Sequence, residues 1–333
     1  MRVAIFTDYS PSVGQGHLTR CCALASWLAE QGCTPTVYVD STRKELGLLS
    51  TQDLKKCQVQ IRRWVENLRV VCQALSAVDF VVVDSYRVDQ PMVDLLESQA
   101  SNLLFIDDFH HFHYRKSWVV DWSLGLEQHP PTGWRGYPKA LMGLDYAVLR
   151  STFCAPLPVR EIGVLREVFV TLGGGETSSH FAYLTTQLAQ SFPGVQFYAT
   201  SLGSPKTAVD LQNLTYLGRL DSLAMRTRMR EADLVVCGLG QTAYEVLSQA
   251  TPVIPIALVD NQANDVAAWR AAPFAPFVLR GDSLGLFGLL RNAIEAMRSE
   301  EVRVEISACM RTLALGGGIA RIMAKIGLAL PNS

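Results

Sequence analysis

Short runs of apolar residues alternate along the chain with longer segments in which apolar and polar positions recur at helical spacing. Continuous apolar runs are typical of strands buried on both faces, and their alternation with helices indicates parallel sheets. In the first half the pattern predicts strands over 3–6, 34–40, 59–64, 80–84 and 103–106, and helices over 17–30, 67–76 and 89–98. In the second half it predicts strands over 168–172, 195–200, 214–218, 234–239 and 251–258, and helices over 179–191, up to 232, after 241 and after 261.

A break in this alternation divides the chain. The segment CAPLPVRE at 154–161 carries two prolines within three positions, which fit neither a helix interior nor a central strand, so we place an interdomain linker there. We expect an α/β protein with two Rossmann-type parallel-sheet domains, residues 1–154 and 155–333. Because parallel sheets bind ligands at the carboxyl ends of their strands, the two domains are expected to face each other across a ligand-binding cleft.

The composition narrows the class of protein and of partner. Of the 333 residues, 49% are hydrophobic and 18% are charged, the reverse of the balance found in disordered chains. The net charge of −1 supplies no overall positive field for nucleic acid. No apolar stretch has the length of a membrane span, and the N-terminal residues do not form a signal peptide. We therefore expect a cytoplasmic monomer without an integral membrane segment.

The eight cysteines lie mostly in apolar segments, and they show neither a CxxC pair nor a Cys/His zinc spacing. We interpret them as buried thiols that behave as small hydrophobic side chains.

The loop between the first strand and the first helix contains Gly14 and Gly16, followed by His17. Glycines allow backbone N–H groups to approach an anion, and a helix N-terminus favours negative charge. The dinucleotide fingerprint would need glycine at position 19, which is threonine, so no such cofactor is expected. The helix dipole disfavours imidazolium, so a neutral His17 could accept a proton; alternatively, His17 only caps a glycine-rich connection.

A second strand–glycine–helix connection occurs in the other half of the chain. The residues predicted to bind phosphate and ribose there are Gly240, Gln241, Thr242 and Glu245. The alternative is an ordinary turn with Glu245 facing solvent. After the next strand, Asn261 and Gln262 would hydrogen-bond sugar hydroxyls and diphosphate, or would only cap the following helix.

Acidic residues follow two further strands of the first half. Asp84, Ser85 and Tyr86 come at the end of the strand over 80–84. The segment DDFHHFH at 107–113 suggests a metal site, but its spacing matches no standard set of ligands, so we predict no metal. Asp107, nearest to the strand end, is the member expected to reach the cleft.

Taken in order, these motifs resemble the nucleotide-sugar hydrolases of the pseudaminic acid pathway, which are relatives of the MurG-type GT-B glycosyltransferases. The opening VGQGHLTRCCALASWLAEQG is similar to the family pattern GxGHxxRcxxLAxxLxxxG, VVVDSY to its D-x-Y strand end and FIDD to its IDD. CGLGQTAYEVLSQATPVIPI with DNQ is similar to its nucleotide-binding half. The resemblance covers nearly the whole chain and departs from the family pattern at GGGETSSH and at DDFHHFHY.

The resemblance implies a GT-B fold and an enzyme that hydrolyses UDP-2,4-diacetamido-2,4,6-trideoxy-β-L-altropyranose at the anomeric carbon, with inversion and without a metal. It implies that His17 is the base that activates water, and that Tyr86 and Asn261 bind or orient the substrate. A GT-B glycosyltransferase with a UDP-amino-sugar donor is the main alternative. A non-catalytic nucleotide-sugar binding protein is a third.

Overall fold

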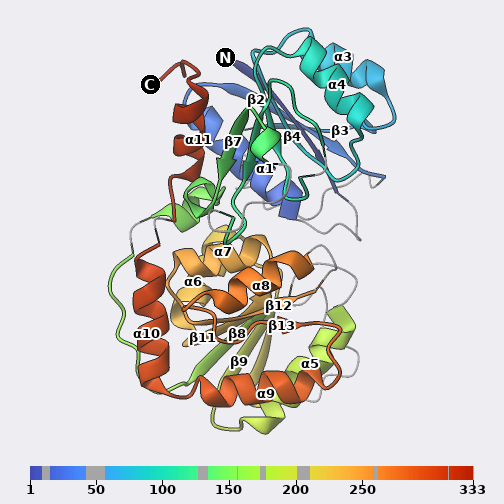
Figure 1. Cartoon of the computed structure of the whole chain (residues 1–333). Helices are drawn as coiled ribbons and strands as arrows, with labels where there is room; N and C mark the ends of the chain where they lie inside the picture. The colour runs from blue at the N-terminus through green and yellow to red at the C-terminus, as the bar shows by residue number, and fades with distance from the viewer. Residues whose placement is uncertain are drawn as a thin grey trace. The chain divides into compact units, whose positions relative to one another are not determined.

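The structure, a computed structural model, describes most of the chain. The described residues are 1–9, 16–42, 57–110, 112–126, 134–155, 157–172, 178–200, 211–258, 262–313 and 315–332. Two of the predicted site residues, Gly14 and Asn261, lie outside these ranges. The chain divides into two compact units: unit 1 consists of Met1–Ser151 and Gly316–Ser333, and unit 2 of Thr152–Leu315 (Figure 1).

Unit 1 contains, in its described part, a seven-stranded parallel sheet with the order β3-β2-β1-β4-β5-β6-β7. Its strands are β1 (Arg2–Asp8), β2 (Thr34–Asp40), β3 (Gln58–Ile61), β4 (Phe80–Asp84), β5 (Leu103–Ile106), β6 (Trp118–Asp121) and β7 (Lys139–Met142). Its helices are α1 (Gly16–Glu30), α3 (Leu68–Leu75), α4 (Gln90–Gln99) and α11 (Gly318–Ile326), with short 3₁₀ turns η1 (Trp134–Gly136) and η2 (Leu144–Tyr146). The strand order reverses between β1 and β4, which makes this the position at which such a sheet binds ligands.

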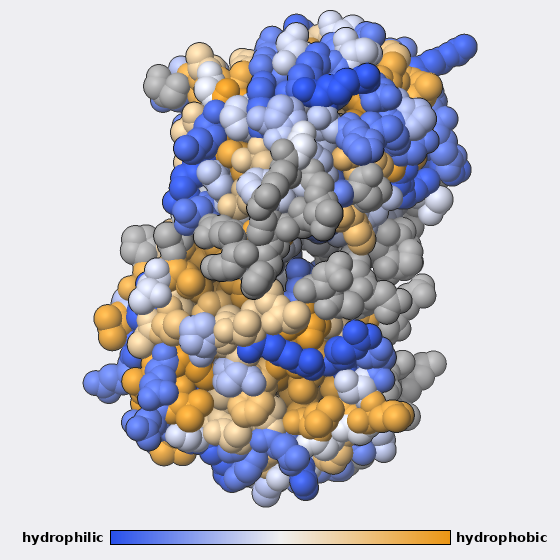
Figure 2. Space-filling view, in the orientation of Figure 1, coloured by the Kyte–Doolittle hydropathy of each residue, from blue (hydrophilic) through white to orange (hydrophobic). Residues whose placement is uncertain are grey.

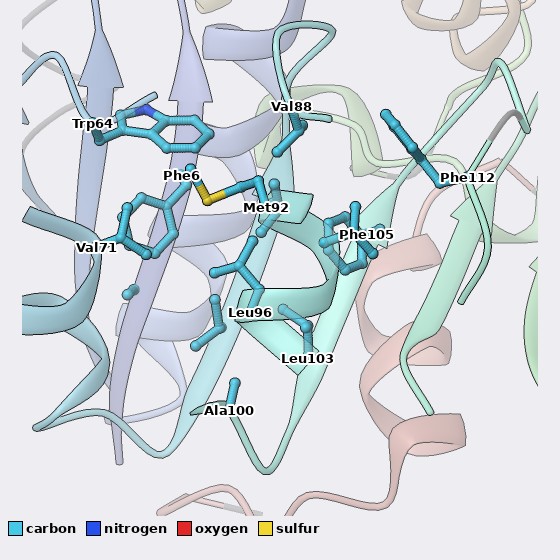
Figure 3. Packing of buried hydrophobic residues seen from close by; sticks show 14 of the residues in the cluster. Phe6, Trp64, Val71, Val88, Met92, Leu96, Ala100, Leu103, Phe105 and Phe112 are labelled. Carbon is cyan, nitrogen blue, oxygen red and sulfur yellow. The ribbon is translucent and has the colours of Figure 1, made fainter. Parts of the chain in front are cut away.

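Helices α3 and α4 cover one face of this sheet. Their apolar side chains form one cluster with alternate residues of the strands, including Phe6 from β1 and Phe105 from β5 (Figure 3). Helix α1 contributes nothing to that cluster and packs on β1 and β2, so it covers the other face. Trp64 is fully buried in the cluster, and its indole N–H donates to the Thr7 carbonyl at 2.8 Å. The chain therefore turns inward after Ile61, and β3 ends earlier than the predicted residue 64.

Unit 2 is built in the same way. Its described part contains a six-stranded parallel sheet with the order β10-β9-β8-β11-β12-β13. The strands are β8 (Glu167–Thr171), β9 (Gln196–Thr200), β10 (Leu214–Gly218), β11 (Leu234–Gly238), β12 (Val253–Ala257) and β13 (Leu279–Arg280). The helices are α5 (Ser178–Ser191), α6 (Ser222–Glu231), α7 (Gln241–Ser248), α8 (Ala263–Ala271), α9 (Leu286–Ala296) and α10 (Glu300–Arg311), preceded by the turn η3 (Ser151–Cys154). The order reverses between β8 and β11.

The predicted α/β class with two parallel sheets is confirmed. Strands β2, β4, β5 and β10 have the predicted bounds. The pattern did not predict β6, β7 or β13. Strands β7 and β13 lie at sheet edges, where the burial that produces an apolar run is incomplete.

The predicted domain limits differ from the units of the structure. The first unit ends at Ser151 rather than at 154, and the last segment of the chain belongs to unit 1 rather than to the second domain. Helix α11 packs on η2, where the Arg321 side chain donates to the Asp145 carbonyl at 2.6 Å. Tertiary contacts of this kind leave no local signal in the sequence. The prediction therefore assigned residues 316–333 to the second domain, which they follow in the chain.

The surface mixes side chains of both kinds. On the face drawn in Figure 2, hydrophilic and hydrophobic residues alternate over both units. None of the helices in the described ranges is long and apolar enough to cross a membrane. All eight cysteines are free thiols; Cys21, Cys22, Cys33 and Cys237 are buried as predicted, whereas Cys72 and Cys154 are exposed.

Candidate active site

The candidate site of unit 1 lies where the strand order reverses. Strands β1 and β4 pair in parallel with Thr7 beside Asp84, so their carboxyl ends lie together. His17 stands in the first turn of α1, the helix that follows β1, and Asp84 is the last residue of β4. His17 is 5% exposed and Asp84 is fully buried. The fold thus brings together two polar side chains that are 67 positions apart.

A short hydrogen bond joins these two side chains. The Nδ1 atom of His17 lies 2.6 Å from Oδ1 of Asp84. Two acceptors at this distance would repel each other, so Nδ1 carries a proton and donates it to the carboxylate. Among the described residues, no hydrogen bond reaches the other ring nitrogen, Nε2. In a neutral ring Nε2 then holds a lone pair, and it can accept a proton.

Arg20 holds Asp84 in place. Its guanidinium donates from Nε to Oδ2 and from a terminal nitrogen to Oδ1, both at 2.6 Å. Burial by itself would raise the pKa of Asp84, but Arg20 and His17 hold that pKa well below its ordinary value. Asp84 is therefore an ionised acceptor, which fixes both the orientation of the His17 ring and the nitrogen that bears its proton.

Tyr86 forms the next side of the site. Its ring meets the His17 ring edge to face, with centroids 4.2 Å apart, and its hydroxyl donates to Asp108 at 2.8 Å. Burial and the charge of Asp108 raise the pKa of Tyr86 well above its ordinary value, so the phenol keeps its proton. The Phe109 ring also meets the Tyr86 ring edge to face, with centroids 4.6 Å apart. The Tyr86 ring thus contacts both His17 and Phe109.

Asp107 serves the loop that carries Asp108 and Phe109. Its carboxylate accepts the backbone N–H groups of Phe109 and His110 and the hydroxyl of Tyr114, and the residue is only 6% exposed. The sequence predicted that Asp107 would reach the ligand; the structure instead places Asp108 beside the His17 site. Direct contact of Asp107 with a substrate stays a prediction.

His110 has a partner of its own. Its Nε2 lies 3.2 Å from Oδ2 of the buried Asp121. Burial lowers the pKa of His110, but the adjacent Asp121 carboxylate and the charges of Asp107 and Asp108 outweigh it, so the net shift is upward. In the part of the chain that the structure describes, no three His, Cys, Asp or Glu side chains are grouped to hold a metal ion.

The predicted phosphate-binding residues of unit 2 follow β11 and β12, which are neighbours in the sheet. Gly240 is the N-cap residue of α7. Because glycine has no side chain, it accepts no hydrogen bond from the first N–H groups of this helix through a side chain. Gln262 comes against this turn: a Cβ on Gly240 would lie 3.2 Å from Gln262 Nε2, and Gln262 Oε1 accepts the Leu258 N–H at 2.8 Å. The fold therefore brings together Gly240 and Gln262, which belong to two separate motifs of the sequence.

Glu245 is buried in α7 and only 2% exposed. The alternative in which it faces solvent is therefore wrong. Its charge contributes to the raised pKa of Cys237 on β11, for which burial is the larger cause. Gln241 and Thr242, in the first turn of the same helix, are partly exposed.

Solved structures with this architecture define the fold of the chain. Acinetobacter baumannii MurG aligns with a TM-score of 0.64 at 15% identity, over 98% of this chain and 99% of MurG. The UDP-GlcNAc 2-epimerase of Neisseria meningitidis bound to UDP-GlcNAc gives 0.62 at 10% identity, over 98% and 99%. Staphylococcus aureus MnaA with UDP gives 0.64 at 12% identity, over 100% and 97%. The chain has the GT-B fold, with two Rossmann-like domains.

A curated protein shares sequence as well. The Helicobacter pylori (strain ATCC 700392 / 26695) protein named pseudaminic acid cytidylyltransferase and UDP-2,4-diacetamido-2,4,6-trideoxy-beta-L-altropyranose hydrolase is 22% identical over 265 residues. The match covers 79% of this chain and 45% of that protein, so the chain spans less than half the length of this relative. No protein-family model matches the chain.

Sequence reasoning found part of this site and missed part of it. The glycine loop drew attention to His17, and the strand-end position drew attention to Asp84 and Tyr86. Arg20 was not among the predicted site residues, and Asp107 was chosen instead of its neighbour Asp108. For Asp108 the one available signal was its place after β5, which Asp107 shares.

Proposed function

We propose that the chain is a nucleotide-sugar hydrolase that releases UDP from UDP-2,4-diacetamido-2,4,6-trideoxy-β-L-altropyranose. The observation that carries the proposal is the hydrogen bond between His17 and Asp84, which leaves Nε2 of a fixed imidazole able to accept a proton. The name of the Helicobacter pylori relative supports the choice of substrate.

The proposed reaction is a direct displacement at the anomeric carbon. The oxygen of a water molecule forms a bond to C1 while the bond from C1 to the diphosphate oxygen breaks, and its electron pair leaves with UDP. Nε2 of His17 takes the water proton and later returns it to solvent. Asp84 keeps its charge throughout and stabilises the imidazolium that forms. The product sugar has the inverted configuration at C1.

Unit 2 would supply the binding of the nucleotide. The N–H groups at the start of α7, from Gln241 onward, would donate to the diphosphate, together with the Thr242 hydroxyl. Gln262, whose side-chain amide lies close to Gly240, would add a second amide donor at the same turn. Glu245 would accept hydroxyl groups of the ribose, and Asn261 would contact the sugar or the diphosphate. Fixed dipoles of this kind stabilise a departing diphosphate without a metal ion.

Unit 1 would supply the binding of the sugar. Tyr86 lies against the base and would orient the sugar ring or the attacking water. Gly14 and Gly16 would let the backbone approach the substrate closely, and Asp107 would contact the substrate.

The test is incubation with the UDP-sugar in ¹⁸O-labelled water without any acceptor. The expected result is release of UDP, with the label on the C1 hydroxyl of the sugar and none in UDP, and with the opposite anomer seen by NMR before mutarotation. Label in the UDP phosphate would contradict attack at carbon. UDP release only with an added sugar acceptor would identify a glycosyltransferase, and tight binding without turnover a binding protein. Activity is expected to survive EDTA.

A further inference from the structure

Arg20 has a position that the proposed reaction does not yet use. We propose that Arg20 keeps His17 available as a base, because its pairing with Asp84 cancels the negative charge that would otherwise hold a second proton on the imidazole. The effect of Arg20 on catalysis rests on the proposed function, whereas the effect of Arg20 on the titration of His17 does not. Arg20 would act through Asp84 and His17, so it is a positioning residue.

The geometry places one cation against both members of the pair. The guanidinium binds both oxygens of Asp84 at 2.6 Å, in the two-pronged arrangement that arginine favours with carboxylates. One of its terminal nitrogens also lies 3.2 Å from Nδ1 of His17. Because Nδ1 already donates its proton to Asp84, it cannot accept a hydrogen bond from Arg20. The contact instead puts the positive charge of Arg20 beside the ring. A second proton on His17 is then opposed by a close like charge.

Arg20 is itself held firmly. Its guanidinium lies over the Trp122 ring, with 5.2 Å to the ring centroid, and a terminal nitrogen lies 3.7 Å from Asp108. Asp108 is the acceptor of the Tyr86 hydroxyl, so one guanidinium spans the carboxylate that orients His17 and the carboxylate that orients Tyr86. Burial would lower the pKa of Arg20, but Asp84 and Asp108 raise it well above the ordinary value, and the charge is permanent.

The other groups that face His17 do not replace this cation. Asp8, at the end of β1, is buried and accepts the Ser85 hydroxyl at 2.6 Å. Asp8 and Asp108 interact electrostatically with His17, and burial raises the pKa of each. Tyr86 keeps its proton and carries no charge. Around His17 the described groups are therefore three carboxyls and one cation, and loss of that cation leaves only groups that favour imidazolium.

The first experiment is an NMR titration of ¹⁵N-labelled histidine in the full chain, with the His17 signal identified by its loss in His17→Gln. In Arg20→Gln we expect the titration midpoint of His17 to rise by about 1–3 pH units relative to the unsubstituted protein. The acid limb of kcat/KM should move upward by the same amount, so that raising the pH recovers activity. A purely structural loss of activity would not recover with pH.

Three further variants separate charge from shape. Asp84→Asn removes the carboxylate and leaves Arg20 beside the ring, so its midpoint should fall. Arg20→Lys keeps the charge and loses the two-pronged fit, so its midpoint should stay near that of the unsubstituted protein while kcat falls. The matched control is Arg63→Gln, since Arg63 is exposed and pairs with the exposed Glu66; it should change neither quantity.

The outcomes distinguish this inference from the proposed function. An unchanged His17 midpoint in Arg20→Gln, or shifts of the same sign in Arg20→Gln and Asp84→Asn, would overturn the role of Arg20 even in an active hydrolase. If Arg20→Gln does not fold, the direction of the shift in Asp84→Asn and the behaviour of Arg20→Lys still decide it. The protein could hydrolyse no UDP-sugar and still show a raised His17 midpoint in Arg20→Gln and a lowered one in Asp84→Asn. That result would refute the proposed function and leave the role of Arg20 standing.

Discussion

Three carboxyl groups surround His17, and they differ in how firmly they stay ionised. Burial raises the pKa of Asp8 and of Asp108. Asp84 is buried as deeply, yet the bidentate Arg20 keeps its pKa well below the ordinary value. A permanently charged acceptor is the one best able to hold the Nδ1 proton of His17. The pairing at Asp84, rather than closeness of carboxylates in general, is what makes His17 a defined base.

Replacement of His17 tests whether this residue acts as the base. For His17→Ala we expect kcat to fall by about 10²–10⁴-fold, the range for loss of a general base, with UDP affinity within a few-fold. Initial rates and calorimetric UDP binding measure the two quantities. His113→Ala, which removes an exposed histidine from the same unit, is the control and should change neither. Near-normal kcat in His17→Ala would remove His17 from the mechanism.

The buried carboxylate of unit 2 should act on binding. Glu245→Gln keeps the volume of the side chain but replaces a charged acceptor, so we expect a raised KM and a smaller change in kcat, because the ribose is remote from the reacting carbon. Steady-state kinetics with UDP-sugar and direct UDP binding check this. The exposed Glu295 provides the control variant Glu295→Gln. An unchanged KM with intact folding would show that Glu245 does not contact the ribose.

At the scale of elements, one glutamate connects helix α4 to the start of β6. The Glu97 carboxylate accepts the backbone N–H groups of Arg115, Lys116 and Ser117 and the Ser117 hydroxyl, at 2.6–3.1 Å. Burial would raise the pKa of Glu97, but these hydrogen bonds lower it below its ordinary value. A charge that satisfies three consecutive N–H groups fixes the direction in which the chain enters β6.

The pH dependence of stability follows from that lowered pKa. Because the folded pKa lies below the unfolded one, the stabilisation is complete above the unfolded value of about 4.3 and is lost as the pH falls through the folded value. We expect Glu97→Gln to lower the free energy of unfolding by roughly 1–3 kcal/mol at pH 7 and by much less at a pH below the folded pKa. Urea unfolding at both pH values, with the exposed Glu305→Gln as control, measures this. A difference independent of pH would mean that the charge is not the cause.

At the scale of the whole molecule, the chain enters unit 1 twice. After unit 2 it returns through α11, and Gly318 at the start of that helix touches η2 so closely that a Cβ would lie 2.1 Å from the Ala147 carbonyl oxygen. The final turn then reaches α1, where the Asn332 N–H donates to the Gln31 carbonyl at 3.2 Å. The end of the chain thus completes the fold of the unit that carries His17.

A single methyl group should therefore weaken one unit selectively. Gly318→Ala forces α11 away from Ala147, and we expect a cost of about 1–3 kcal/mol, typical of overpacking, confined to the unfolding of unit 1. Calorimetry resolves the two units if they unfold separately, and hydrogen exchange resolves them otherwise. Gly288→Ala is the control: its Cβ meets no atom within 4 Å and lies inside α9, so it should be neutral or stabilising. Equal destabilisation of both units by Gly318→Ala would contradict this account.

The local pattern of the chain determined the elements and the class of fold. The pattern predicted the bounds of β2, β4, β5 and β10 to the residue. Strands β4 and β5 are buried throughout and therefore require continuous apolar runs. The glycine loop before His17 and the glycine turn before α7 were also visible, since close backbone approach needs residues without side chains.

The tertiary structure alone decided the partners of these elements. Strand order places β4 beside β1, and only this pairing brings Asp84 to His17 and Arg20. It also brings Asp108 to Tyr86 and Arg20, whereas the Asp107 carboxylate accepts N–H groups of its own loop. The contacts of residues 316–333 likewise assign this segment to unit 1. Periodicity reports whether a residue is buried, but which buried residue it meets depends on contacts between segments far apart in the chain, and those contacts leave no local trace.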